Sequence, residues 1–394
     1  MAQRQLISGR RLAWLQQELE QWRSAGLVDQ AGAEAIGARY QASSRARAAR
    51  TLLMLGAALF GVGIIWLVAS NLEIDEAGPL TRFAFVAALW LGFMSLAEVV
   101  RRRERFSALA GPLALLAAIG YGATIFQVAQ SLQVPAYEPL LLVAWAGGAL
   151  AYAYATAASG PFVLGVGAAV ASTVWLLSRD VESGASFVLG LALAVPFATA
   201  AAVAHQGTRR EPFAGAWRCA SGLLALLALG GAAIPGVLED ATVPAPALVA
   251  AGVTLLVVAA AAVRADRRGR AELAIAVACA LAGLALAFAA PDSVADPFSG
   301  DDPSAAQLAH TLVASALFLA LSLGLAFVGV ARESAALTNL AITAIVLFVA
   351  IQSFGLIAPL ISGAALVLSV GAILVVCGLL ADRGRRRLLK DVAS

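Results

Sequence analysis

Residues 80–128 read LTRFAFVAALWLGFMSLAEVVRRRERFSALAGPLALLAAIGYGATIFQV, two apolar runs on either side of the basic segment RRRERF at 101–106. A run of about 20 apolar residues is long enough to cross a bilayer as a helix. A helix on the surface of a soluble protein instead carries a wide polar face. The stretch therefore predicts two transmembrane helices joined by a short basic turn.

The same alternation of apolar runs and short polar breaks continues along most of the 394-residue chain. The composition agrees, because 61% of the residues are hydrophobic and only 13% are charged, against about 25% charged in a soluble domain. We predict an all-α, polytopic helical membrane bundle with about twelve spans. The predicted spans are 51–70, 80–100, 107–128, 139–156, 160–177, 184–205, 214–235, 245–263, 271–290, 309–330, 335–351 and 358–381.

The basic residues orient this bundle. If the N-terminus is inside, 24 of the 27 Lys and Arg residues fall on the cytoplasmic side. The opposite loops are acidic and carry only Arg82 and Arg179 as basic residues. The positive-inside rule then places both ends of the chain in the cytoplasm, and the Arg clusters indicate topology rather than nucleic-acid binding. The predicted cytoplasmic segments are 1–50, 101–106, 206–213, 264–270, 331–334 and 382–394.

Residues 1–50 are polar and form a separate module. Apolar residues at three- and four-residue spacing predict a first helix, which Gly26 ends, and Asp29 can cap a second helix. We predict a cytoplasmic two-helix hairpin, which is too small to be stable alone. It should dock on the membrane domain, on a second copy or on a partner protein. The predicted docking face consists of Leu12, Leu15, Leu19 and Trp22.

Residues 51–381 form the predicted transmembrane domain. Its loops are echoed about 165 residues later, which predicts two parallel halves, 51–205 and 214–381, as in many transporters. Any alternating topology also repeats its own charge pattern, so this alternative stays open. The basic tail 382–394 suits contact with anionic lipid headgroups, although a role in stopping and orienting the last span explains it equally well. The predicted headgroup contacts are Arg383, Arg385, Arg386, Arg387 and Lys390.

The third span and its exit form the densest polar stretch. Tyr121, Thr124 and Gln127 recur at three-residue spacing and share a helix face. One interpretation is a polar cavity open to the outside, and the other is interhelical hydrogen bonding that fixes packing, with Tyr152 or Tyr154 as partners. The residues of the candidate cavity are Tyr121, Thr124, Gln127, Gln130, Tyr137, Glu138 and Tyr152.

Ionisable residues lie near the ends of the predicted spans rather than near their centres. Glu98 is expected to pair with Arg102, four residues later. Glu272 opens the ninth span beside Arg268 and Arg270, where a helix N-terminus favours negative charge. Arg218 is expected to extend to water from a span end.

This distribution argues against an ion-coupled transporter, which usually places an ionisable group at mid-depth. Pro196 falls within the sixth span and predicts a kink. No phosphate loop, nucleophile elbow or metal motif occurs, so we expect neither an enzyme nor a cofactor. Two function classes remain: a transport-like or lipid-handling protein, and a non-enzymatic scaffold that docks through its hairpin.

The whole chain resembles a family of bacterial predicted membrane proteins, catalogued as domain of unknown function 2157. The resemblance implies a multi-pass protein of the bacterial inner membrane and hints at a protein partner, but it implies no activity. Family members often have Asn-Trp after the first span, where this chain has Asn71 and Leu72, and Gly-Asp after the third, where Glu138 is the nearest acidic residue. The stretches that carry the resemblance are WLQQELEQWRSAGLVDQAGAEAIGARY at 14–40, LGAALFGVGIIWLVASNLE at 55–73, IGYGATIFQVAQSLQV at 119–134, LLVAWAGGALAYAYATAASGPFVLGVGAAVASTVWLL at 141–177, ARESAALTNLAITAIVLF at 331–348 and GLLADRGRRRLLK at 378–390.

Overall fold

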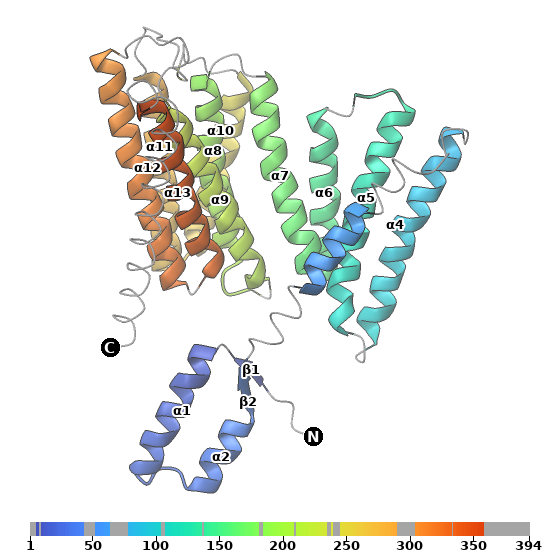
Figure 1. Cartoon of the computed structure of the whole chain (residues 1–394), viewed down its shortest axis with the longest axis vertical. Helices are drawn as coiled ribbons and strands as arrows, with labels where there is room; N and C mark the ends of the chain where they lie inside the picture. Colours follow the sequence, from blue (N-terminus) through green and yellow to red (C-terminus); the bar gives the residue numbers. More distant parts are fainter. Residues whose placement is uncertain are drawn as a thin grey trace. The chain divides into compact units, whose positions relative to one another are not determined.

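The chain folds into two compact units, Met1–Ala136 and Tyr137–Ser394, and both are almost entirely helical where they are described (Figure 1). The computed structural model describes residues 5–7, 9–42, 52–63, 78–103, 107–135, 138–180, 184–208, 210–234, 238, 245–289, 304–332 and 334–357.

The first unit begins with the predicted hairpin, formed by α1 (Gly9–Ser24) and α2 (Gln30–Ala38). Gly26 follows α1 with a φ of +71°, and the Leu27 N–H donates to the Trp22 carbonyl, which together make a Schellman ending. Asp29 caps α2 by accepting a hydrogen bond from Gly32 N at 2.8 Å. The predicted stop and cap are therefore confirmed.

Two short strands, which the sequence analysis did not predict, flank the hairpin helices. β1 (Gln5–Ile7) and β2 (Tyr40–Ala42) pair in parallel, with Gln5 opposite Tyr40. Parallel strands need a crossover connection between them, and here α1 and α2 together supply it. Strands of three residues are too short to leave a recognisable alternation of polar and apolar residues in the sequence.

The rest of the first unit consists of the apolar helix Leu52–Gly63, α4 (Pro79–Arg102) and α5 (Ser107–Ser131). Small residues let these helices approach closely. A Cβ at Gly120 of α5 would lie 3.1 Å from Trp90 Cα of α4, and one at Gly61 would lie 3.0 Å from Ile119 Cδ1. Close packing, rather than a gap, therefore separates α4 from α5 at this level.

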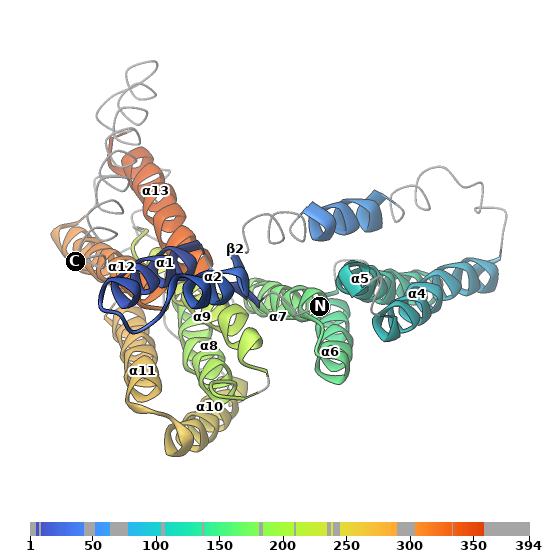
Figure 2. The same ribbon diagram turned by 90° about the horizontal axis from the view of Figure 1, so that it is seen from below.

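The second unit is built around α8 and α9, which contact each other extensively (Figure 1). Its core includes Val188 and Leu191 of α8, both 0% exposed, and Phe318, whose ring stacks on Phe348 with centroids 4.0 Å apart. In Figure 2, α9 lies between α8 and the pair α12 and α13, both of which contact it. The helices of this unit are α6 (Pro139–Thr156), α7 (Ser159–Asp180), α8 (Gly184–Ala204), α9 (Glu211–Ala232), α10 (Ala245–Arg264), α11 (Arg267–Phe288), α12 (Ala305–Ala331) and α13 (Ala335–Ile357).

Length and composition agree with a helical membrane protein. Among the described residues, nine helices are long and apolar enough to cross a bilayer, and Leu52–Gly63 and Leu248–Arg264 are shorter apolar helices. These account for eleven of the predicted spans, and the last, 358–381, lies outside the described residues. These helices are consistent with a helical membrane protein, while the number of spans and their orientation stay predictions.

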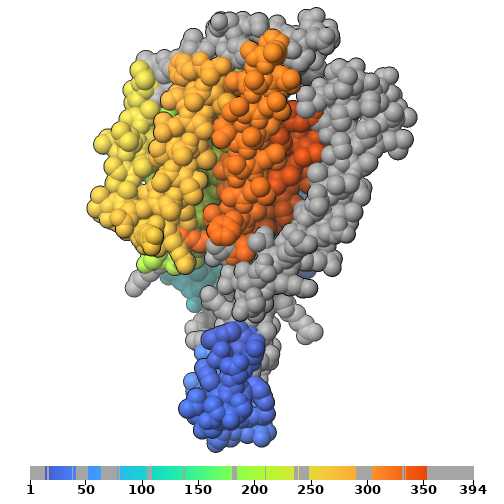
Figure 3. All heavy atoms as spheres, turned by 90° about the vertical axis from the view of Figure 1, so that its left-hand side faces the viewer, coloured from blue at the N-terminus to red at the C-terminus, as the bar shows by residue number. Residues whose placement is uncertain are grey.

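The outer faces of the second unit are apolar, the reverse of a soluble surface. Leu255 and Leu256 of α10 are 69% and 73% exposed, and Phe327 of α12 is 66% exposed. Figure 3 shows α10, α11 and α12 on one side of this unit. Such contiguous exposed apolar surface fits lipid contact.

Several helices begin before their apolar runs. α12 starts at Ala305, four residues before the predicted span, because Ser304 and Gln307 form a capping box. α11 starts at Arg267, where Asp266 accepts a hydrogen bond from Gly269 N at 2.6 Å. Hydropathy locates the buried length of a span, whereas capping residues decide where the helix begins.

Candidate functional site

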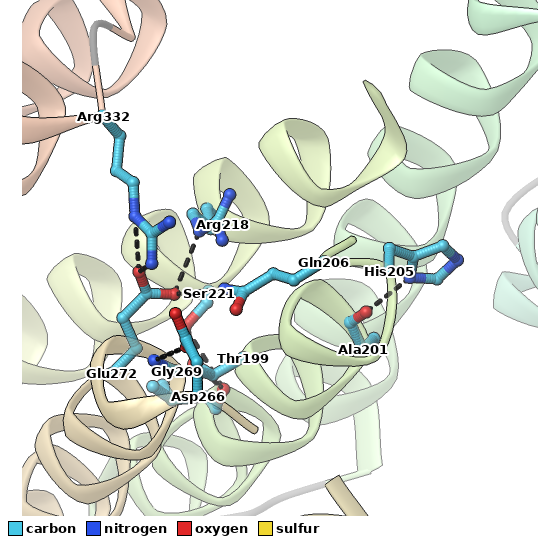
Figure 4. A network of polar contacts seen from close by, with 11 residues as sticks. Thr199, Ala201, His205, Gln206, Arg218, Ser221, Asp266, Gly269, Glu272 and Arg332 are labelled. Carbon is cyan, nitrogen blue, oxygen red and sulfur yellow. Dashed lines mark hydrogen bonds and ion pairs between the residues drawn. The ribbon is translucent and has the colours of Figure 1, made fainter. Parts of the chain in front are cut away.

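The most enclosed group of ionised side chains described in the second unit lies where α9, α11 and the end of α12 meet (Figure 4). Glu272 is at its centre, less than two turns into α11. Arg218 reaches it from α9, and Arg332, the residue that follows α12, reaches it from the other side. We call Arg218, Glu272 and Arg332 the Glu272 cluster.

Four donor contacts saturate the Glu272 carboxylate. Arg332 donates to Oε1 from Nε at 3.0 Å and from Nη2 at 2.5 Å. Arg218 Nε donates to Oε2 at 3.0 Å, and Gln206 Nε2 makes a longer contact to the same oxygen at 3.4 Å. A carboxylate has about four lone-pair sites, so this one has no further acceptor to offer.

The cluster is largely enclosed and carries more positive than negative charge. The exposed fractions of the side chains are 13% for Glu272, 14% for Arg218 and 25% for Arg332. Two guanidinium groups therefore face one carboxylate with little water around them. Arg218 Nη2 is enclosed and has no hydrogen-bond partner among the described residues. A buried donor without an acceptor is expensive, and more so when it is charged.

Glu272 and Arg218 lie in the first turns of their helices, near the span ends where they were predicted, but no partner was predicted for either. Glu272 pairs with Arg218 and Arg332 instead of the neighbouring Arg268 and Arg270, both of which are exposed. Arg218 points into the protein and pairs there, so its predicted extension to water is wrong. One signal was available: Arg218 and Glu272 are opposite charges inside two different predicted spans, and each lacks a neutralising residue in its own span.

The cluster also brings together three segments that are far apart in the sequence. Gln206, Glu272 and Arg332 come from the loops 206–213, 264–270 and 331–334 or directly beside them, and all three make contact at one end of the second unit. The charge pattern predicted that these loops share one side of the membrane. Their meeting at one end is what that topology requires.

A second polar group lies beside the same loops. Tyr154 of α6 contacts His205, with its hydroxyl 3.0 Å from Nε2, and Trp217 Nε1 donates to the same hydroxyl at 3.5 Å. His205 Nδ1 lies 2.5 Å from the Ala201 carbonyl, which can only accept, so Nδ1 carries a proton. In the neutral ring Nε2 then accepts from Tyr154. The Arg210 guanidinium lies 5.0 Å from the Tyr154 ring centre and donates to its carbonyl at 3.0 Å.

Stacked rings hold this second group in place. Phe162 of α7 and Phe213 of α9 stack with centroids 3.8 Å apart, and both contact the Tyr154 ring edge to face. Tyr154 was one of two candidate partners for Gln127 of the third span. Within the second unit its hydroxyl bonds His205 and Trp217, and the pairing with Gln127, which belongs to the first unit, stays a prediction.

Hydroxyl groups join α8 and α9 in the interior. Thr199 and Ser221 lie 2.7 Å apart, and each also lies within hydrogen-bond distance of the Val195 carbonyl, at 3.0 and 3.2 Å. Two hydroxyl protons are available for three contacts, so one hydroxyl donates to the other, which donates to Val195. Pro196 lies in α8 beside this contact and lacks a backbone N–H. Pro196 thus lies inside a helix, and the kink predicted there stays a prediction.

The predicted polar face of the third span lies on α5. Tyr121 packs against Trp90 of α4 with ring centroids 5.2 Å apart. Thr124 is 6% exposed and donates to the Gly120 carbonyl of its own helix at 2.9 Å. Gln127 is half-buried and Gln130 is exposed. The contacts of Tyr121 and Thr124 favour the packing interpretation at their level of the helix.

The remaining candidates of that stretch belong to the second unit or are not described. Glu138 caps α6 by accepting from Leu140 N at 3.5 Å, and it pairs with Arg179 Nη1 at 2.7 Å. Tyr152 is half-buried on α6. Tyr137 lies outside the described residues, and so do the basic tail residues Arg383, Arg385, Arg386, Arg387 and Lys390.

The predicted docking face of the hairpin is partly used within the first unit. Leu19 is 6% exposed, while Leu15 and Trp22 are half-buried. The side chain of Leu12 is not described. Among the described side chains of the hairpin, the large apolar ones that stay exposed are Trp14, at 57%, and Leu27, at 74%. Docking through this module stays a prediction, with Trp14 and Leu27 as additional contacts.

Comparison with known proteins supports the resemblance over part of the chain. No curated protein and no solved structure matches it. Residues 20–162, from the hairpin to the start of α7, match one family model, and the resembling stretches at 331–348 and 378–390 lie outside that match. The chain is thus similar, over residues 20–162, to the family described as predicted membrane protein (DUF2157).

Proposed function

We propose that this chain is a transport-like, lipid-handling protein of the bacterial inner membrane, with twelve spans and both ends in the cytoplasm. The proposed role is non-catalytic, and its partners are membrane lipids, anionic lipids among them. That the chain is a helical membrane protein is supported by its long apolar helices and by the family match.

The observation that carries the proposal is the contact between Thr199 and Ser221 beside Pro196. It joins the two most enclosed helices of the second unit through hydroxyls, which are 6% and 8% exposed. Hydroxyl groups can exchange one acceptor for another at little cost, and proline weakens the ladder of its own helix. An interface of this kind can rearrange without moving a charge into lipid.

The position of the ionised groups supports the same proposal. Near their centres, the predicted spans contain no ionisable residue that could couple substrate movement to an ion. A substrate with an apolar body suits such an interior better than a small ion does. Lipids also reach the protein from the bilayer, through the exposed apolar faces of α10 and α12.

The test reconstitutes the full chain in vesicles and follows movement of a fluorescent phospholipid between the leaflets. The variant Thr199→Val with Ser221→Ala should slow this movement several-fold, because it removes the exchangeable hydroxyl contact. Ser322→Ala is the matched control: Ser322 is 0% exposed, and its hydroxyl bonds only the Phe318 carbonyl of its own helix in the described structure, at 2.9 Å. Movement no faster than in protein-free vesicles would refute the proposal.

A membrane scaffold is the second candidate, favoured by the exposed Trp14 and Leu27 of the hairpin. Under this alternative the hairpin captures a protein partner or a second copy. Deleting residues 1–45 should then abolish capture while the membrane domain stays folded, as judged by an unchanged elution volume in detergent. Equal partner recovery with and without the hairpin would refute it.

A further inference from the structure

The Glu272 cluster contains a cationic donor that the described protein does not satisfy. Arg218 uses Nε on Glu272, and Nη2 has no acceptor among the described residues although it is enclosed. Figure 4 shows its terminal nitrogens on the side away from the carboxylate. Since Glu272 already receives four contacts, it cannot satisfy Nη2 as well.

The charges around this donor call for an anion. Arg218 and Arg332 face a single carboxylate, which leaves one positive charge in excess in a group whose side chains are at most 25% exposed. Asp266 is nearby in Figure 4, but it is exposed and caps α11 through Gly269 N. The next basic residues, Arg268 and Arg270, are exposed and add to the positive potential.

The depth of the cluster indicates where such an anion would come from. Arg218 lies about two turns into α9, and Glu272 less than two turns into α11, both counted from the loops expected on the cytoplasmic side. In the predicted topology this end of the unit faces the cytoplasmic leaflet, where both headgroup phosphates and soluble phosphates are available. A planar guanidinium matches two oxygens of a phosphate group better than it matches a halide.

We propose that the Glu272 cluster is a phosphate-binding site at the cytoplasmic end of the second unit, in which Arg218 Nη2 donates to a phosphate oxygen. Gln206, whose 3.4 Å contact is the weakest in the cluster, moves aside to admit the ligand. Arg332 stays on Glu272 and holds the carboxylate against Arg218 Nε. This site does not depend on lipid translocation: a chain that moves no lipid can still bind phosphate here.

The test measures binding to the purified full chain in neutral detergent, by the rise of its unfolding temperature with ligand concentration. The probes are inorganic phosphate, a short-chain phosphatidic acid, and chloride at the same ionic strength. Arg218→Lys keeps the charge and the pairing with Glu272 but removes the terminal fork. It should weaken phosphate binding about tenfold.

A further variant keeps the test decisive if Arg218→Lys folds poorly. Gln206→Ala leaves both ion pairs in place, so it should bind the probes at least as tightly as the unaltered chain. Arg102→Gln is the matched control, because Arg102 belongs to the exposed pair with Glu98 on α4; it should bind normally.

Each outcome decides the proposal. A response to both probes that Arg218→Lys weakens supports a general phosphate site, and a response to phosphatidic acid alone supports a lipid headgroup site. Equal binding by Arg218→Lys and the unaltered chain would overturn the proposal. Loss of binding in Gln206→Ala would overturn it as well, because Gln206 would then be part of the binding group instead of moving aside for the ligand.

Discussion

Two glutamates in this chain each pair with two arginines, one in each unit. Glu98 pairs with Arg101 and Arg102, which lie three and four residues later on α4, at 2.7 and 2.8 Å. Glu272 pairs with Arg218 and Arg332, which are 54 and 60 residues away. The Glu98 arginines are 52% and 77% exposed, against 14% and 25% for the Glu272 arginines. One carboxylate with two guanidinium groups can therefore lie exposed at the end of a single helix, or it can connect three helices.

The contribution of such a cluster to stability depends on how exposed its charges are rather than on the number of ion pairs. Exposed pairs contribute roughly 0–1 kcal/mol, because water competes for both partners. Breaking an enclosed pair costs about 3–5 kcal/mol, because the remaining charge stays buried without its partner. The Glu98 group should therefore contribute little to stability, and the Glu272 cluster should stabilise one end of the second unit.

The largest expected effect is that of Glu272→Ala. It leaves two enclosed guanidinium groups facing each other, so the free energy of unfolding should fall by about 3–5 kcal/mol. Thermal unfolding of the purified chain in detergent measures the change. Replacing Arg218 with Met, Glu272 with Leu and Arg332 with Met at once removes every charge and should restore most of the loss. If the triple variant is as unstable as the single one, buried charge is not the cause.

A smaller effect is expected for Tyr154→Phe. The change keeps the stacked ring but leaves His205 Nε2 and Trp217 Nε1 without the hydroxyl that both contact. The free energy of unfolding should fall by about 1–3 kcal/mol. The control is Tyr121→Phe in the first unit. Phe162→Tyr would not serve, because it would add a hydroxyl to a side chain that is only 1% exposed. If both variants lose the same free energy of unfolding, the contact of Tyr154 with His205 has no special role in stability.

A local effect is expected for Gly26→Ala in the hairpin. Gly26 has a φ of +71°, which alanine adopts only with strain, and nothing lies within 4 Å of a Cβ placed there. The hairpin should lose about 1 kcal/mol, all of it from backbone conformation. Limited proteolysis between α1 and α2 of the full chain should become faster. Gly37→Ala, inside α2 and with equally open surroundings, should leave the cleavage rate unchanged or lower it.

The smallest effect is expected for Glu98→Ala. Its partners stay solvated when it is removed, so the unfolding temperature should change little. The same unfolding experiment as for Glu272→Ala measures it. A loss as large as that of Glu272→Ala would show that α4 depends on this pair as strongly as the second unit depends on the Glu272 cluster.

What the sequence could predict follows the same division between local and distant contacts. The spans, the stop at Gly26, the cap at Asp29 and the Glu98 pair depend on residues at most about 20 positions apart, and hydropathy and helix spacing contain that information. The partners of Glu272 depend on which helices pack together. Arg268 and Arg270 lie at closer spacing in the sequence, yet Arg218 and Arg332 are the ones brought within reach.

The polar face of the third span illustrates the same difficulty. A three-residue spacing shows that Tyr121 and Thr124 share a face, but not what that face meets. In the structure Tyr121 meets Trp90, and Thr124 bonds its own helix. Thr199 and Ser221, whose hydroxyls join α8 to α9, lie in stretches rich in alanine and leucine where no polar cluster marks them.

The most direct test of the account is a pair of double-mutant cycles on the full chain, one for Glu272 with Arg332 and one for Glu98 with Arg102. Each cycle compares the unfolding free energies of the two single alanine variants and the double variant. We expect a coupling energy above about 1.5 kcal/mol for Glu272 with Arg332, and a much smaller coupling for Glu98 with Arg102, whose charges are solvated. Equal couplings would contradict the claim that the Glu272 cluster fastens the second unit at its predicted cytoplasmic end.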